Sequence, residues 1–95
     1  MAFFVYIVAS KRNGTLYVGM TDDLPKRICL HKSGLLPGFT RTYGVKTLVW
    51  LEMHDSRYAA IARERQLKKR NRAWKLELIE QQNPEWRDLM PEIAA

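Results

Sequence analysis

The sequence of 95 residues contains one cysteine, Cys29, and no long run of hydrophobic residues. One cysteine cannot build a disulfide framework or a zinc site of several thiolates, so we expect a reducing, cytoplasmic environment. The apolar N-terminus, residues 1–9, is short and lacks a basic leader, which argues against a signal peptide and a membrane span. Proline and glycine are sparse, with four and five residues, so no long disordered tail is expected.

Acidic residues are outnumbered by basic ones. Ten Asp and Glu stand against sixteen Lys and Arg, which leaves a net charge of +6 and a pI near 9.8. A polyanion is therefore a reasonable partner, and we expect DNA without excluding RNA. The chain length predicts a single domain over residues 1–95, which would bury somewhat over ~60% of the surface of its unfolded chain.

Two segments at the start of the chain predict a β-hairpin. Residues 3–9 and 16–19 are rich in β-branched and aromatic side chains, and the polar stretch between them ends in Asn13-Gly14. Such a pattern is the strongest short-range signal for a hairpin. Side chains alternate between the two faces of a strand, so Tyr6 and Tyr17 fall on the same face in either of two registers.

The register decides whether the two tyrosines can meet. A two-residue turn at Asn13-Gly14 would leave Tyr6 and Tyr17 roughly 13 Å apart. A four-residue loop over residues 11–14 would place Tyr17 opposite Val8, with Tyr6 as its diagonal neighbour at roughly 7–8 Å. Asn-Gly favours the two-residue turn, but four-residue loops are common too, so the residues alone leave both registers open.

The rest of the chain predicts helices and one further strand. Capping residues, apolar periodicity and β-rich composition set the expected elements. In order, these are a helix over 24–32, a loop over 35–44, a strand over 45–52, helices over 57–70 and 72–81 with a break at Asn71, and a final turn or short helix from Asn83-Pro84. The predicted fold class is α/β (α+β), with a small three-stranded, mainly antiparallel sheet flanked by helices. We expect the three tryptophans in its core.

One acidic residue lies within a strongly basic stretch. Residues 57–75 contain eight basic residues and a single acid, Glu64. A solvated helix surface, with Glu64 and Lys68 as an ordinary i,i+4 pair worth ~0.3–0.5 kcal/mol, would explain this pattern. However, Glu64 precedes Leu67 by about one turn and leans toward the core side of the helix. A carboxylate there needs a partner, and Mg²⁺ held by one carboxylate, waters and phosphate oxygens would serve.

Several short motifs follow one another in a distinctive order. Along the chain they are Phe4-Val5-Tyr6, Tyr17-Val18-Gly19, Arg27, His31, Glu64 and Asn83-Pro84-Glu85-Trp86-Arg87. In this order they resemble the GIY-YIG nuclease family, and most closely its small single-domain bacterial branch, the UPF0213-like proteins. The resemblance spans residues 3–89, with Phe4 in place of the usual glycine of the first motif. It implies a GIY-YIG-like fold and favours the longer hairpin loop, because the family brings its two tyrosines together.

The resemblance also implies catalytic roles. Glu64 would be the sole protein ligand of a divalent metal, Mg²⁺ or Mn²⁺, and Arg27 would hold the scissile phosphate. Tyr6 or Tyr17 would align or deprotonate the nucleophile. A phenol with an ordinary pKa of about 10 is a poor base at neutral pH, so it would need Arg27, the metal or His31 nearby. The alternative for His31 is a role in packing alone, without a direct part in catalysis.

We therefore expect a metal-dependent DNA endonuclease that hydrolyses phosphodiester bonds. Because we expect no second DNA-binding domain, we expect the protein to recognise the structure of DNA rather than its sequence. Such an activity would belong to DNA repair or recombination. A homodimer or a partner protein could supply what one domain lacks. The alternative is a binding module of the same fold with weak or no cleavage, which Phe4 would permit. A small interaction protein would explain the charge but not the motif order. Residues that could contact phosphate are Arg41, Lys68, Lys69, Arg70 and Asn83, although for Asn83 a helix cap is the favoured explanation.

Overall fold

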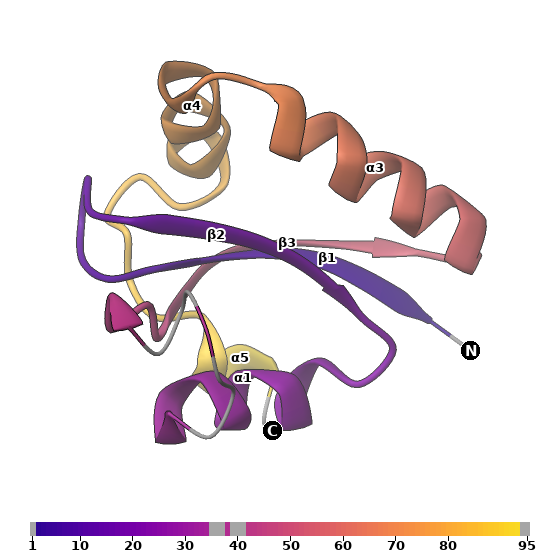
Figure 1. Cartoon of the computed structure of the whole chain (residues 1–95), viewed down its shortest axis with the longest axis horizontal. Coiled ribbons are helices and arrows are strands. Elements are labelled where there is room, and N and C mark those ends of the chain that lie inside the picture. Colours follow the sequence, from indigo (N-terminus) through magenta and orange to yellow (C-terminus); the bar gives the residue numbers. More distant parts are fainter. Residues whose placement is uncertain (1, 35–37, 39–41, 94–95) are drawn as a thin grey trace.

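The computed structural model describes residues 2–34, 38 and 42–93. In this part of the chain, one sheet lies between two layers of helices, with α3 and α4 on one face and α1 and α5 on the other (Figure 1). The elements are β1 (Phe3–Ala9), β2 (Leu16–Thr21), α1 (Leu24–Ser33), β3 (Thr47–His54), α3 (Arg57–Lys69), α4 (Arg72–Gln82) and α5 (Met90–Ile93). The predicted three-stranded sheet flanked by helices is confirmed, and most of the loop predicted over 35–44 lies outside the described residues. No helix in the described ranges is long and apolar enough to cross a membrane.

The sheet has the order β2-β1-β3, and both pairings are antiparallel. β1 and β2 are joined by a four-residue loop, residues 11–14. The backbone N–H of Ser10 donates to the carbonyl of Thr15 at 3.0 Å, and Asn13 turns the chain with a φ of 57°. Val8 therefore lies opposite Tyr17, which confirms the longer of the two predicted loops.

The third strand lies two residues later than predicted. The sequence indicated residues 45–52, whereas β3 covers Thr47–His54. β-propensity marks residues that suit a strand, but pairing with β1 decides where the strand begins and ends. That pairing runs from Thr47 opposite Ala9 to His54 opposite Phe3, with a bulge where Ile7 and Val8 meet β3.

Local signals define the helix ends well. The side chain of Asp23 accepts a hydrogen bond from the backbone N–H of Lys26, and Gly34 ends α1 with a φ of 72°, which favours glycine. Asn71 accepts from the backbone N–H of Trp74 at 2.8 Å and so caps α4. The predicted break at Asn71 is confirmed, and the ends of α1, α3 and α4 fall within one residue of the prediction.

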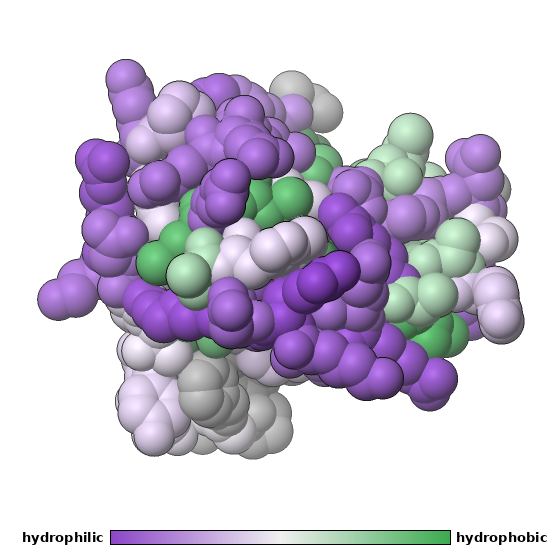
Figure 2. Space-filling model, turned by 90° about the horizontal axis from the view of Figure 1, so that it is seen from above, coloured by the Kyte–Doolittle hydropathy of each residue, from purple (hydrophilic) through white to green (hydrophobic). Residues whose placement is uncertain are grey.

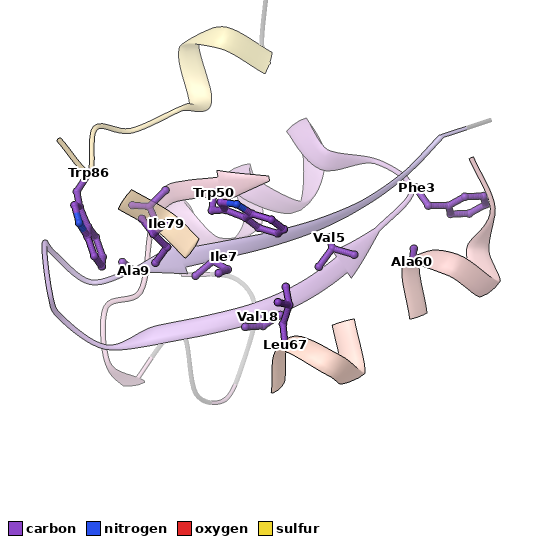
Figure 3. Packing of buried hydrophobic residues seen from close by; sticks show 11 residues of the cluster. Phe3, Val5, Ile7, Ala9, Val18, Trp50, Ala60, Leu67, Ile79 and Trp86 are labelled. Atoms are coloured by element: carbon purple, nitrogen blue, oxygen red, sulfur yellow. The ribbon is translucent and has the colours of Figure 1, made fainter. Parts of the chain in front are cut away.

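Alternation along β1 supplies two hydrophobic cores, one on each face of the sheet. The α3-side core comprises Phe3, Val5, Ile7, Ala9, Val18, Val49, Trp50, Ala60, Leu67, Ile79 and Trp86 (Figure 3). The α1-side core comprises Tyr6, Val8, Leu24, Ile28, Val45, Leu48 and Leu89. Trp50 and Trp86 are buried and Trp74 packs against the α3-side core, as predicted. The same strand thus presents Val5 and Ile7 to one layer and Tyr6 to the other.

Candidate active site

Tyr6 lies at the middle of the central strand, 1% exposed, and faces Gly19 across the β1–β2 pair. A Cβ atom on Gly19 would stand 2.4 Å from the Tyr6 hydroxyl oxygen. The phenol ring therefore lies directly over the backbone of Gly19. This close approach is the physical reason why the second motif needs glycine at this position.

His31 joins the two tyrosines. It lies in the last turn of α1 and is 3% exposed, with its Nε2 2.9 Å from the Tyr6 hydroxyl oxygen. Its ring centroid lies 5.6 Å from that of Tyr6 and 5.7 Å from that of Tyr17. The diagonal register of the hairpin and the position of α1 thus bring three aromatic rings from three elements together.

Burial shifts the pKa values of both Tyr6 and His31. The pKa of Tyr6 is raised far above its ordinary value, mainly by desolvation and further by Tyr17 and Glu64, while the charge of Arg27 lowers it. The pKa of His31 is lowered to about 4 by desolvation and by Arg27. At neutral pH the pair therefore consists of a protonated phenol and a neutral imidazole sharing one hydrogen bond. A phenol in this state is a hydrogen-bond donor and a poor base.

Glu64 and Lys68 approach from α3, past the edge strand β2. The Glu64 side chain is 21% exposed, and the Lys68 Nζ lies 3.5 Å from its Oε2. The same Nζ lies 5.8 Å from the centre of the Tyr17 ring. The i,i+4 pair expected of a plain helix surface is present, and it stands beside the tyrosines. The structure therefore contains the ordinary i,i+4 pair, while the role of Glu64 as a metal ligand stays a prediction.

Arg27 stands one turn before His31 on α1, at the rim of the aromatic group. It lines an open hollow of about 320 Å³ together with Thr21, Asp22, Asp23, Lys26 and Leu30. Its charge acts on both Tyr6 and His31, as their shifted pKa values show. The guanidinium is therefore close to the buried phenol and open to a ligand in the hollow.

Phe4 occupies the place of the glycine in the first motif. It pairs with Thr21 on one side and with Met53 on the other, so the strand continues through it. Its ring is partly buried against the α1-side core. The substitution is accommodated by packing, and Tyr6 keeps its position over Gly19.

The residues expected to contact phosphate lie in different surroundings. Lys68 lies beside Glu64 and Tyr17, and Lys69 and Arg70 are exposed at the end of α3. The guanidinium of Arg70 lies 5.0 Å from the centre of the Trp74 ring. Arg41 lies outside the described residues.

Asn83 is placed as a structural residue. It is 2% exposed, ends α4, and donates through Nδ2 to the carbonyls of Val49 and Arg87 at 3.1 and 2.8 Å. Its Oδ1 accepts from the backbone N–H of Arg87 at 3.2 Å. The expected phosphate contact is at odds with this burial, because the amide is used to fasten the C-terminal segment to β3. The turn predicted at Asn83 is present, closed by the Trp86 N–H donating to the Asn83 carbonyl.

Sequence reasoning missed one contact that shapes this region. The guanidinium of Arg72, at the start of α4, donates to the carbonyls of Asn13 and Gly14 at 2.5 and 2.7 Å. These partners lie 59 and 58 residues away along the chain. Backbone carbonyls carry no residue-specific signal, so no pattern in the sequence could have indicated the contact.

Known proteins resemble this chain in both sequence and structure. A family model described as the GIY-YIG catalytic domain matches residues 2–77. A UPF0213 protein of Syntrophus aciditrophicus (strain SB) is 43% identical over 83 residues, which cover 86% of this chain and 93% of the relative. A UPF0213 protein of Clostridium perfringens (strain 13 / Type A) is 40% identical over 76 residues, covering 80% and 81%. The solution NMR structure of the UPF0213 protein BH0048 from Bacillus halodurans matches with a TM-score of 0.58 and 30% identity, covering 93% of both chains.

Proposed function

This chain belongs to the GIY-YIG family, a nuclease-type family, and on that premise we propose that it is a metal-dependent DNA endonuclease that recognises DNA structure rather than sequence. The observation that carries the proposal is the convergence of polar side chains from three elements around one buried phenol, that of Tyr6 of β1. These side chains are Tyr17 of β2, Arg27 and His31 of α1, and Glu64 of α3.

Hydrolysis of a phosphodiester needs an oriented water, stabilised charge on the phosphate oxygens and a stabilised leaving oxygen. Arg27 would bind the phosphate, and its position at the edge of the open hollow supports this role. Tyr6 stays protonated and is held by His31, so its role is to donate a hydrogen bond. Tyr17, the less buried of the two phenols, is left to align or deprotonate the attacking water.

The residues present fit a divalent metal held by one carboxylate. Among the described residues, no group of three or more His, Cys, Asp or Glu side chains is arranged to hold an ion. Mg²⁺ and Mn²⁺ accept one carboxylate completed by waters and substrate oxygens, which matches the partly exposed Glu64. When bound, the metal would supply Lewis-acid stabilisation of charge on the phosphate. Lys68, now 3.5 Å from Glu64, would have to yield its place on the carboxylate.

The test is cleavage of a supercoiled plasmid and of flap and junction DNAs, with and without Mg²⁺ or Mn²⁺. We expect metal-dependent nicking by the wild type, lost at least 100-fold in Glu64→Ala. Glu77→Ala is the matched control, because Glu77 is an exposed helical acid on the outer side of α4. Nicking of branched or nicked substrates would point to repair or recombination. One site cuts one strand, so cutting both strands would call for a homodimer or a partner protein.

The second candidate is a nucleic-acid-binding module without cleavage. Phe4 in the first motif and the Glu64–Lys68 pair are the observations in its favour. Tight, salt-sensitive binding with no cleavage in either metal would establish it in place of the nuclease.

A further inference from the structure

Three segments that are distant in sequence meet at one end of the sheet. The two hydrogen bonds from Arg72 hold the hairpin loop, residues 11–14, against the start of α4. Only Arg70 and Asn71 separate α4 from the end of α3. Figure 1 shows the hairpin loop on the same side of the molecule as α4. The fold therefore joins the hairpin tip and the helix junction into one surface.

That surface is basic and nearly free of acids. We call it the basic strip, and it consists of Lys11, Arg12, Lys68, Lys69, Arg70, Arg72 and Lys75. All of these are exposed except Lys75, which is partly buried. No Asp or Glu occurs in residues 1–21 or 65–76, the segments that build it. Hydrophilic side chains spread widely over the face seen from above α3 and α4 (Figure 2).

The basic strip begins at the active site. Lys68 belongs to both, since its Nζ lies 3.5 Å from Glu64 and 5.8 Å from the centre of the Tyr17 ring. From Tyr17 the strand β2 leads back to the hairpin loop, three residues away at Gly14, or roughly 10 Å. Phosphates on one strand of a duplex advance about 3.4 Å per nucleotide along the axis. The strip is therefore long enough to follow several consecutive phosphates outward from the site.

We propose that the basic strip binds the phosphate backbone of a duplex arm flanking the cleavage site. Sites for single strands combine positive charge with exposed aromatic platforms on which bases stack. Two aromatic residues adjoin the strip: Tyr17 belongs to the active site, where its ring lies against His31, and Trp74 is partly buried, with the Arg70 guanidinium 5.0 Å from its ring centre. Tyr58 is 85% exposed, but it lies at the other end of α3, roughly 16 Å from Lys69. The strip thus offers charge without stacking, which suits a duplex.

This inference rests on the proposed function for its substrate, but its test needs no cleavage. Binding of a fluorescent 20-base-pair duplex and of its single strand is measured by anisotropy, in EDTA, from 50 to 250 mM salt. In the variant Lys11→Ala/Arg12→Ala we expect at least tenfold weaker duplex binding at low salt. The slope of log K against log salt should become shallower by about 2, since each lost phosphate contact changes it by about 0.9.

The matched control removes the same charge elsewhere. Lys32→Ala/Arg57→Ala changes α1 and the far end of α3, and should leave the slope within about 0.5 of the wild type. Lys75→Ala tests the α4 side of the strip independently and should reduce the slope by about 1. Circular dichroism establishes that each variant is folded. Both variants of the strip should bind the single strand more weakly than the duplex, as the wild type does.

The results separate this inference from the proposed function. If no DNA is cleaved in any metal but the slopes change as described, the basic strip is established and the nuclease is not. If metal-dependent nicking is found while the strip variants keep the wild-type slope, the nuclease stands and the strip is overturned. Equal losses in the control variant, or tighter binding of the single strand than of the duplex, would also overturn it.

Discussion

The two faces of the sheet differ in what they bury. The α3-side core is built from apolar side chains, and the charged side chains of Glu52 and Arg63 stay partly exposed beside it, where Glu52 accepts from His54 at 2.8 Å and from Arg63 at 2.9 Å. The α1-side core encloses the hydroxyl of Tyr6, which is bonded to the buried His31. Burying a titratable pair costs stability that an apolar core does not lose. We infer that one face mainly stabilises the fold while the other is arranged for chemistry.

The strand β1 makes this division possible. Its side chains alternate, so Ile7 and Tyr6 are neighbours in sequence but belong to opposite layers. A strand at the centre of a sheet is paired on both edges, which holds it rigidly in place. The apolar residues of β1 thereby fix the position of its buried phenol, Tyr6. Substitutions on the two faces should consequently separate stability from activity.

The largest expected effect belongs to the α3-side core. Ile79→Ala removes a fully buried side chain on α4, a helix that carries none of the proposed catalytic residues. We expect the free energy of unfolding to fall by about 2–5 kcal/mol, measured by chemical denaturation. Below the melting temperature, kcat should stay within about twofold of the wild type. A large loss of kcat in the folded variant would break the division between the two faces.

Gly19→Ala should affect stability and the site together. The three heavy atoms nearest to the new Cβ all belong to Tyr6, at 2.4–2.9 Å, so the buried ring must move away from His31. Overpacking of this kind costs about 1–3 kcal/mol. In a double-mutant cycle with Tyr6→Ala, the penalty of Gly19→Ala should largely disappear. A penalty that persists would place its origin in the backbone of β2 instead.

Acid should destabilise the α1 side through His31. Its pKa falls from an ordinary 6.5 in the unfolded chain to about 4 in the fold, so below pH 6.5 the unfolded state binds more protons. Stability is therefore complete above pH 6.5 and declines as the pH falls toward 4, by about 2 kcal/mol at pH 5. In the part of the chain that the structure describes, Arg27, Tyr6 and Tyr17 are charged or titratable groups close to the ring. His31→Gln should be less stable at pH 7.5 but lose this dependence, which denaturation at pH 5 and 7.5 would detect.

Features of the fold that depend on contacts between residues close in sequence were predictable, and those that depend on distant residues were not. Helix ends near Asp23, Gly34 and Asn71 depend on contacts within four residues, and the sequence located them to within one residue. The strand β3 was misplaced by two residues because its ends depend on pairing with β1: Thr47 pairs with Ala9, 38 residues away, and His54 with Phe3, 51 residues away. The role of Asn83 was ambiguous for the same reason, since its carbonyl partner at Val49 is 34 residues distant.

The site shows the same limit. The residues of the site were identified from the order of the motifs. Local sequence patterns did not decide between the two hairpin registers. The structure adds the contacts between elements: His31 between the two tyrosines, and the buried state of Tyr6 that makes it a donor. Spacing along one helix could place Arg27 beside His31, but it could not indicate which of them is buried.

The smallest expected effect on stability belongs to the rim of the α1 side. Arg27→Ala removes a partly exposed side chain from the edge of an open hollow, so the free energy of unfolding should change by no more than about 1 kcal/mol. Cleavage should fall at least 100-fold, because the guanidinium would no longer bind the phosphate. Its charge also lowers the pKa of His31, so NMR titration of the imidazole should show that pKa rising in the variant. Lys26→Ala, one position earlier and also lining the hollow, is the control and should leave the His31 pKa unchanged. A fall in melting temperature as large as that of Ile79→Ala would show that the catalytic face carries the fold as well, and the division drawn between the two faces would not hold.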